Sequence, residues 1–260
     1  MTEKDPRLDE FRRLLDILDE LRAKCPWDMK QTNESLRKLT IEETFELADA
    51  IIENNDLEIC GELGDIMLHI AFYSKIGSEK GTFDIADVLR GINNKLIYRH
   101  PHVFGDVTVS GSSEVEKNWE KLKMNEKEEY KPVLSGVPGS LPAMIKANRI
   151  QEKVRGVGFD WEVREQVWDK VAEEISELKH EVLNGKKEAI ESEFGDVLFS
   201  LVNAARLYEI DPEAALERTN RKFMKRFNYL ERETLGKGKS LHDMTLDEMN
   251  EIWEKAKEED

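Results

Sequence analysis

The chain contains the same pattern of acidic residues twice. The segment IEETFELADAII, followed by GELGDIMLHIA, aligns without a gap with AEEISELKHEVL, followed by SEFGDVLFSLV. A repeat of this kind indicates that one structural module is duplicated in tandem, so the fold must be one that forms twice in the same chain. The matched acidic residues are Glu42, Glu43, Glu46, Glu62 and Asp65 in the first copy, and Glu173, Glu174, Glu177, Glu193 and Asp196 in the second.

Two further pairs recur after the acidic residues in each copy. One is a Lys–Arg pair and the other a Trp–Lys pair, and the members of each pair are one helical turn apart. Cations with this spacing suit the phosphates of a nucleotide, and a tryptophan beside them suits a nucleobase. The pairs are Lys95–Arg99 and Trp119–Lys123 in the first copy, and Lys222–Arg226 and Trp253–Lys257 in the second.

Apolar residues recur every three or four positions along most of the chain, as they do in residues 11–21 and 167–182. This period is typical of amphipathic helices, whereas the alternation typical of strands is scarce. The sequence therefore predicts an all-α protein made of two helical-bundle modules. Prolines and glycines are densest between residues 130 and 142, which predicts an N-terminal domain at 1–130, a linker at 131–142 and a C-terminal domain at 143–260.

The composition excludes several classes of partner. The chain has 39 Lys and Arg against 55 Asp and Glu, a formal net charge of −16, which disfavours non-specific binding to nucleic acid. The longest apolar run, near residues 66–73, is too short to span a membrane, and no signal peptide precedes it. Cys25 and Cys60 form no CxxC motif, so we expect both to be reduced thiols. Together these features predict a cytoplasmic protein without a membrane or nucleic-acid partner.

The spacing of the acidic residues predicts a metal site in each copy. Residues three positions apart share one face of a helix, so Glu174 lies beside Glu177, and Glu193 beside Asp196. A short turn between the two helices would bring the four carboxylates together. Because such a cluster is unfavourable without a cation, and oxygen ligands favour hard ions, we expect Mg²⁺ or Mn²⁺ with a phosphorylated ligand.

An alternative explanation is that these glutamates are solvated or cap a helix. In the first copy Thr40 and Glu43 have the spacing of a capping box, in which both glutamates would stabilise a helix N-terminus. The residue matching Thr40 in the second copy is Val171, which cannot cap, yet all the acidic residues are retained. The repeat therefore favours metal binding.

These motifs resemble the MazG-type nucleoside triphosphate pyrophosphohydrolases, in their tandem-domain form, of the all-α NTP pyrophosphatase superfamily. The EExxE and ExxD motifs of both copies carry the resemblance. Further matching blocks cover most of the chain from residue 8 to its end: CPWD with QT at 25–32, HPHVFGD at 100–106, NWEKLK at 118–123, GVP with LPA at 136–143, and IQEKVRGVGFDW at 150–161.

The resemblance implies Mg²⁺-dependent hydrolysis of ATP and other NTPs or dNTPs to the monophosphate and pyrophosphate, in cleansing of the nucleotide pool. It also implies a homodimer with four-helix-bundle cores and a C-terminal half that is the main catalytic unit. Metal ligands would be Glu174, Glu177, Glu193 and Asp196, with Glu173 as a supporting residue or base, and Glu43, Glu46, Glu62 and Asp65 would hold metal in the first copy. Lys222, Arg226, Trp253 and Lys257 would bind substrate. The corresponding candidates in the first copy are Lys95, Arg99, Trp119 and Lys123, and Glu42 corresponds there to Glu173.

A different class of function uses the same residues. A nucleotide sensor would bind metal and NTP without turnover and would signal through a protein partner. Only a measurement of turnover separates this alternative from the enzyme.

Overall fold

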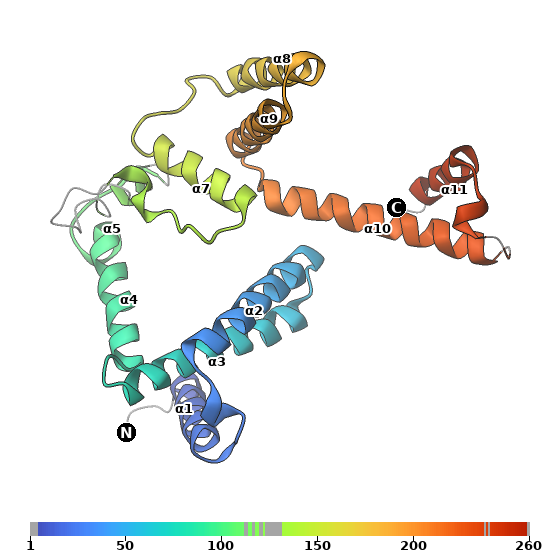
Figure 1. The fold of residues 1–260 in the computed structure, drawn as a ribbon. Coiled ribbons are helices and arrows are strands. Elements are labelled where there is room, and N and C mark those ends of the chain that lie inside the picture. Colours follow the sequence, from blue (N-terminus) through green and yellow to red (C-terminus); the bar gives the residue numbers. More distant parts are fainter. Residues whose placement is uncertain are drawn as a thin grey trace. The chain divides into compact units, whose positions relative to one another are not determined.

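A computed structural model of the chain describes residues 5–111, 114–115, 118–119, 122, 132–236, 238 and 240–258. All regular secondary structure in these residues is helical (Figure 1). The predicted all-α class is therefore confirmed. The chain divides into two compact units, residues 1–126 and 127–260. Each helix in the described residues is too short or too polar to cross a lipid bilayer.

Side-chain caps fix where several helices of the first unit begin. The hydroxyl of Thr32 accepts from the backbone N–H of Ser35, whose hydroxyl accepts from the backbone N–H of Thr32. Asp84 and Asp87 form the same reciprocal pair. These contacts satisfy N–H groups that have no partner inside the helix. The described helices of this unit are α1 (Pro6–Lys24), η1 (Asp28–Lys30), α2 (Asn33–Glu53), α3 (Asp56–Glu79), α4 (Ile85–Arg99) and α5 (Pro101–Phe104).

The second unit contains the corresponding helices. Thr245 and Glu248 cap its last helix, because each side chain accepts from the other residue's backbone N–H. The described helices are η2 (Val133–Gly136), α7 (Ala143–Arg155), η3 (Arg164–Gln166), α8 (Val167–Asn184), α9 (Lys187–Leu207), α10 (Pro212–Gly236), η4 (Leu241–Asp243) and α11 (Leu246–Glu258).

In each unit the acidic residues lie on two helices joined by a two-residue turn. Asn54 and Asn55 connect α2 to α3, and Gly185 and Lys186 connect α8 to α9. Asn54 has a φ of 54°, the left-handed conformation that asparagine tolerates at a helix C-terminus. Such short turns make the paired helices antiparallel neighbours, as Figure 1 shows for α2 with α3.

The predicted linker lies within the second compact unit. Part of it forms η2, which packs against α7, where the Lys153 ammonium donates to the Val133 carbonyl oxygen at 3.3 Å. The domain limits drawn from the sequence, 1–130 and 143–260 with a linker at 131–142, stay a proposal.

Each unit has its own apolar core. In the first, buried side chains of α1, α2 and α3 meet, and in the second the start of α8 packs against the end of α9. These contacts hold the acidic helix pairs in place. The buried residues are Leu18, Leu36, Ala71, Phe72 and Ile76 in the first core, and Val167, Val171 and Ala204 in the second.

A partly buried ion pair ties the loop before α8 to the end of α9. Arg206 donates to both carboxylate oxygens of Asp160, and its Nε donates to the Asn203 side-chain oxygen at 3.0 Å. Burial raises the pKa of Asp160, but its hydrogen bonds with Arg206 and with the Trp161 backbone N–H outweigh this, so the pKa lies below its ordinary value. The Arg206 side chain is 7% exposed and that of Asp160 19%.

Replacing Arg206 with methionine is expected to destabilise the second unit by about 2 kcal/mol, because it removes charge-assisted hydrogen bonds from the Asp160 carboxylate and leaves it the more distant cation Arg155. Hydrogen exchange of α9 amides in the full chain measures this. Arg149→Met, which removes an exposed pair with Glu152, is the matched control and should change stability by less than about 0.5 kcal/mol. Equal effects of the two substitutions would contradict a stabilising role for the Arg206 pair.

Candidate active site

The structure gathers carboxylates of each repeat into a cluster. In the first copy one oxygen each from Glu43, Glu62 and Asp65 lie within 4.8 Å of one another. In the second copy the same holds for Glu174, Glu177 and Glu193. Each cluster combines residues from both helices of an antiparallel pair, as the spacing predicts. An all-oxygen donor set of this size fits a hard divalent cation.

The fourth predicted ligand of each cluster lies outside this radius but close to it. Glu46 raises the pKa of Glu43 and Glu62, and Asp196 raises that of Glu193, although in each case other causes are larger. Both residues are exposed, and so is Glu42.

The clustered carboxylates resist ionisation when no cation is present. Burial is the largest cause of the raised pKa of Glu43, Glu62 and Glu193, and the charges of neighbouring carboxylates add to it. One oxygen of Glu62, Oε2, is buried without a hydrogen-bond partner. A buried acceptor without a donor is unfavourable, which a bound cation would relieve.

One cation already contacts the second cluster. The Lys170 ammonium lies 2.8 Å from Glu174 Oε1 and 3.1 Å from Glu173 Oε1. These hydrogen bonds, the one to Glu174 first, raise the pKa of Lys170 above its ordinary value. The Glu174 side chain is only 10% exposed, so the contact is well shielded from water. Lys170 was not predicted as a site residue.

The capping explanation for the first copy is wrong. Thr40 lies inside α2, eight residues after the N-cap Thr32, so no free N–H groups remain for it to satisfy. Its hydroxyl instead donates to the Leu36 carbonyl oxygen and contacts the Tyr73 hydroxyl at 2.8 Å. Neither copy of the acidic motif therefore owes its glutamates to a helix terminus.

Replacing Glu62 with glutamine is expected to stabilise the metal-free protein. Because the pKa of Glu62 is raised in the folded protein, protonation of Glu62 stabilises the fold at pH values below 4.5, the ordinary pKa of glutamate. This stabilisation is lost as the pH rises through the raised pKa. At pH 7 the uncharged glutamine should raise the thermal midpoint in EDTA by about 2–4 °C. A thermal scan at pH 5 and pH 7 measures it, and a midpoint below that of the unmodified chain at pH 7 would contradict the cluster's electrostatics.

The predicted Arg and Trp side chains meet in both copies. The Arg226 guanidinium on α10 lies 6.0 Å from the ring centre of Trp253 on α11, so this contact links the two helices. Arg99 lies 5.2 Å from the ring centre of Trp119 in the first copy. A cation over an indole ring is attracted by its electron-rich face. The sequence predicted the members of each contact as parts of two separate pairs, and the structure joins them.

The remaining predicted cations are on the surface. Lys222 and Lys95 are exposed, and Lys257 is paired with Glu254 at 2.6 Å. Lys123 lies outside the residues that the structure describes. The site residues of the second copy thus form two groups, the carboxylates on α8 and α9 and the cations with Trp253 on α10 and α11.

An aromatic neighbour of Trp253 was not predicted. Phe223 lies 5.0 Å from Trp253 and stacks on Phe227, yet it is 57% exposed. The corresponding residue of the first copy is Leu96, so a comparison restricted to identical residues passes over it. In the first copy His100 takes the place beside Trp119, at 4.9 Å.

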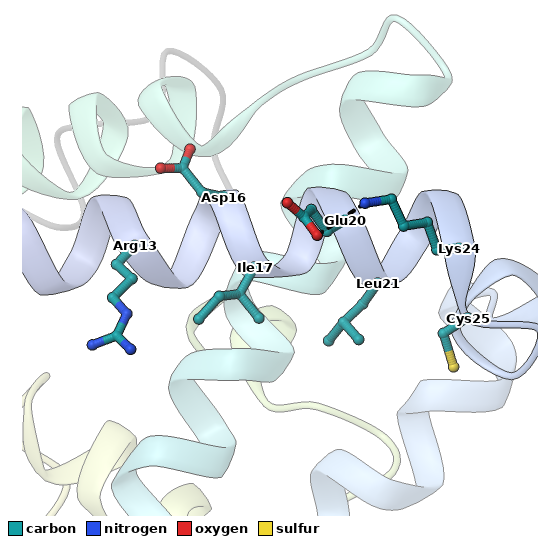
Figure 2. Close-up of a pocket in the computed structure, with 7 residues that line it drawn as sticks. All are labelled: Arg13, Asp16, Ile17, Glu20, Leu21, Lys24 and Cys25. Atoms are coloured by element: carbon teal, nitrogen blue, oxygen red, sulfur yellow. Dashed lines mark hydrogen bonds and ion pairs between the residues drawn. The ribbon is translucent and has the colours of Figure 1, made fainter.

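A groove along α1 carries none of the predicted site residues. It has a volume of about 440 Å³ and is lined in part by Arg13, Ile17 and Leu21, which point to the same side in Figure 2. Glu20 and Lys24, which also line it, are paired with each other at 3.1 Å. The acidic clusters lie elsewhere, on α2 with α3 and on α8 with α9.

Comparison with known proteins agrees with the geometry. The family model described as MazG nucleotide pyrophosphohydrolase domain matches residues 31–104 and again residues 164–230. The chain is 45% identical over 250 residues to the nucleoside triphosphate pyrophosphohydrolase/pyrophosphatase MazG of Thermotoga maritima, covering 95% of each chain. It is 38% identical over 260 residues to the nucleoside triphosphate pyrophosphohydrolase of Escherichia coli K12, covering 97% of this chain and 99% of that one. With two matched domains and these relatives, the chain belongs to the MazG family of nucleotide pyrophosphohydrolases.

Proposed function

We propose that this protein hydrolyses nucleoside triphosphates, ATP among them, to the monophosphate and pyrophosphate and thereby cleanses the nucleotide pool. The observation that carries the proposal is the convergence of Glu174, Glu177 and Glu193, whose oxygens lie within 4.8 Å of one another. The names of the relatives support the same reaction. We assign the main catalytic role to the second copy.

The residues fit Mg²⁺ as the cofactor, with Mn²⁺ as a substitute. Glu174, Glu177, Glu193 and Asp196 would hold it, and burial together with the charges of neighbouring carboxylates raises the pKa of Glu193. A bound ion would polarise the α-phosphoryl group and neutralise charge on the phosphates. Glu43, Glu46, Glu62 and Asp65 would hold an ion in the first copy.

The chain's own cations bind and orient the substrate. Lys222, Arg226 and Lys257 would contact the phosphate oxygens, since charge-assisted hydrogen bonds to phosphate are strong and directional. Trp253 would close the base side. In the first copy Glu42, Lys95, Arg99, Trp119 and Lys123 would take the corresponding positions, although Arg99 is 7% exposed and already packed on Trp119.

Glu173 is the candidate for orienting or deprotonating the attacking water. Its side chain is 54% exposed, and it contacts Lys170 at 3.1 Å. This lysine holds Glu173 next to Glu174, so a water bound between the cluster and the phosphate chain would find an acceptor there. Positioning and charge neutralisation dominate phosphoryl chemistry, so no covalent nucleophile is required.

We further propose that the working unit is a homodimer in which the helix pairs form four-helix-bundle cores. Large apolar side chains remain exposed beside the carboxylates on both acidic helix pairs. A second copy of the chain would cover them, and sedimentation should then give twice the mass of the chain. These side chains are Ile41, Phe45, Leu63 and Met67 in the first unit, and Ile175, Phe194, Leu198 and Phe199 in the second.

The proposed activity is tested by phosphorus NMR of ATP incubated with the purified chain and Mg²⁺. AMP with pyrophosphate is the expected outcome, and EDTA should abolish it. Formation of ADP and phosphate would contradict the proposal. Binding of ATP without turnover would also contradict it and would favour the nucleotide sensor.

A further inference from the structure

The two acidic clusters differ by one cation. At the repeat spacing, the residue that corresponds to Lys170 is Leu39, which packs against the apolar core of the first unit. Glu43 and Glu62 of the first cluster correspond to Glu174 and Glu193 of the second, but the first cluster lacks the ammonium that contacts Glu174. This asymmetry gives the two clusters different affinities for a free metal ion.

We propose that the first cluster, formed by Glu43, Glu62 and Asp65, holds a resident divalent ion without nucleotide, whereas the second takes up its ion only together with a phosphate ligand. The proposal rests on the metal binding assumed in the proposed function. It assigns the two copies different roles, a permanently loaded site and a site that is loaded with each substrate.

The first cluster has an unanswered demand for positive charge. The side chains that act on Glu43 and Glu62 are other carboxylates, and Glu62 Oε2 is buried without a hydrogen-bond partner. A divalent ion entering this cluster displaces no protein cation. The ion relieves the mutual repulsion of the carboxylates and is coordinated by the oxygen that has no hydrogen-bond partner.

The second cluster is already partly neutralised. A free ion that binds Glu174 must compete with the Lys170 ammonium, which lies 2.8 Å from Oε1 of that residue on a carboxylate that is 10% exposed. Displacement breaks the ion pair with the buried Glu174 and leaves Lys170 only the exposed Glu173, which reduces the net gain from binding the ion. A phosphate that arrives with the ion supplies a new partner for Lys170. Binding of free metal is therefore weak, and binding of metal with a phosphate ligand is not.

The test is a titration of the full chain with Mn²⁺. The chain is first stripped of metal with EDTA, which is then removed, and electron paramagnetic resonance of the free ion measures how much Mn²⁺ binds. Without nucleotide, we expect one tight ion per chain, which is lost in Glu62→Gln and retained in Glu193→Gln. Adding a non-hydrolysable ATP analogue should bring in a second ion, and only in chains with Glu193 intact.

Lys170→Leu, which installs the residue of the first copy, should tighten nucleotide-independent binding at the second cluster by about tenfold or more. Lys179→Leu, which removes an exposed lysine elsewhere on α8, is the control and should leave nucleotide-independent binding unchanged. Two results would overturn this inference and leave the metal site of the proposed function in place. One is two equally tight ions in the unmodified chain, and the other is loss of the tight ion in Glu193→Gln instead of Glu62→Gln. No bound Mn²⁺ with or without the ATP analogue would overturn the metal site of the proposed function as well.

Discussion

Glu174→Gln is expected to lower kcat for ATP hydrolysis by about a thousandfold, equivalent to about 4 kcal/mol of transition-state stabilisation. The substitution removes the charge of the one glutamate of the second cluster that is buried, and glutamine oxygen is a much weaker ligand for a hard cation. Glu43→Gln in the first copy should lower kcat by less than about threefold. The difference follows from the main catalytic role proposed for the second copy.

Steady-state kinetics with saturating Mg²⁺ measure both variants. Glu188→Gln, which neutralises an exposed glutamate in the first turn of α9 outside the cluster, is the control and should retain full activity. Equal losses in Glu174→Gln and Glu43→Gln would show that both copies turn over substrate, and would contradict the assignment of the main catalytic role to the second copy.

Arg226→Ala should raise KM for ATP by about 10- to 100-fold, since a hydrogen bond to a charged partner contributes about 1.5–3 kcal/mol. Arg226 lies over Trp253, so the substitution removes both a phosphate contact and a support of the base side. Arg226→Lys should recover only part of this loss, because lysine cannot make paired hydrogen bonds to one phosphate.

Arg232→Ala provides the matched control for packing. Arg232 is exposed on the same helix and lies 5.2 Å from the ring centre of Tyr229, so it repeats the cation–ring contact away from Trp253. Its removal should leave KM unchanged. If the two alanine substitutions raise KM equally, Arg226 acts through the packing of α10 and not through the substrate.

The sequence alone was sufficient to predict those parts of the fold that depend on local spacing. The 3.6-residue period predicted the helices, and the short segments at Asn54 and Gly185 predicted the turns that make each acidic pair antiparallel. Three of the four carboxylates in each predicted set come together because residues three apart share a helix face. Their roles in catalysis stay predictions.

Two site features were missed for different reasons. Lys170 is four residues before Glu174, so its contact was readable from helix geometry, but the matching of identical residues between the copies ignored it. Phe223 was missed for the same reason, since Leu96 stands in its place in the first copy. Differences between the copies carry as much information as identities.

Other features depend on tertiary contacts that one sequence does not encode visibly. Arg206 and Asp160 are 46 positions apart, and only packing of α9 against the preceding loop brings them together. The capping explanation at Thr40 failed because the N-cap of α2 is Thr32, and Ser35 rather than a glutamate completes the capping box. When a sequence offers two possible caps for one helix, the structure shows which of them is used.

The most direct test of the account is the fate of solvent oxygen when ATP is hydrolysed in oxygen-18 water with Mg²⁺. Mass spectrometry of the products locates the attacking water. The account predicts one labelled oxygen in AMP and none in pyrophosphate, because the α-phosphorus is attacked. Label in pyrophosphate, or in inorganic phosphate released with ADP, would contradict it.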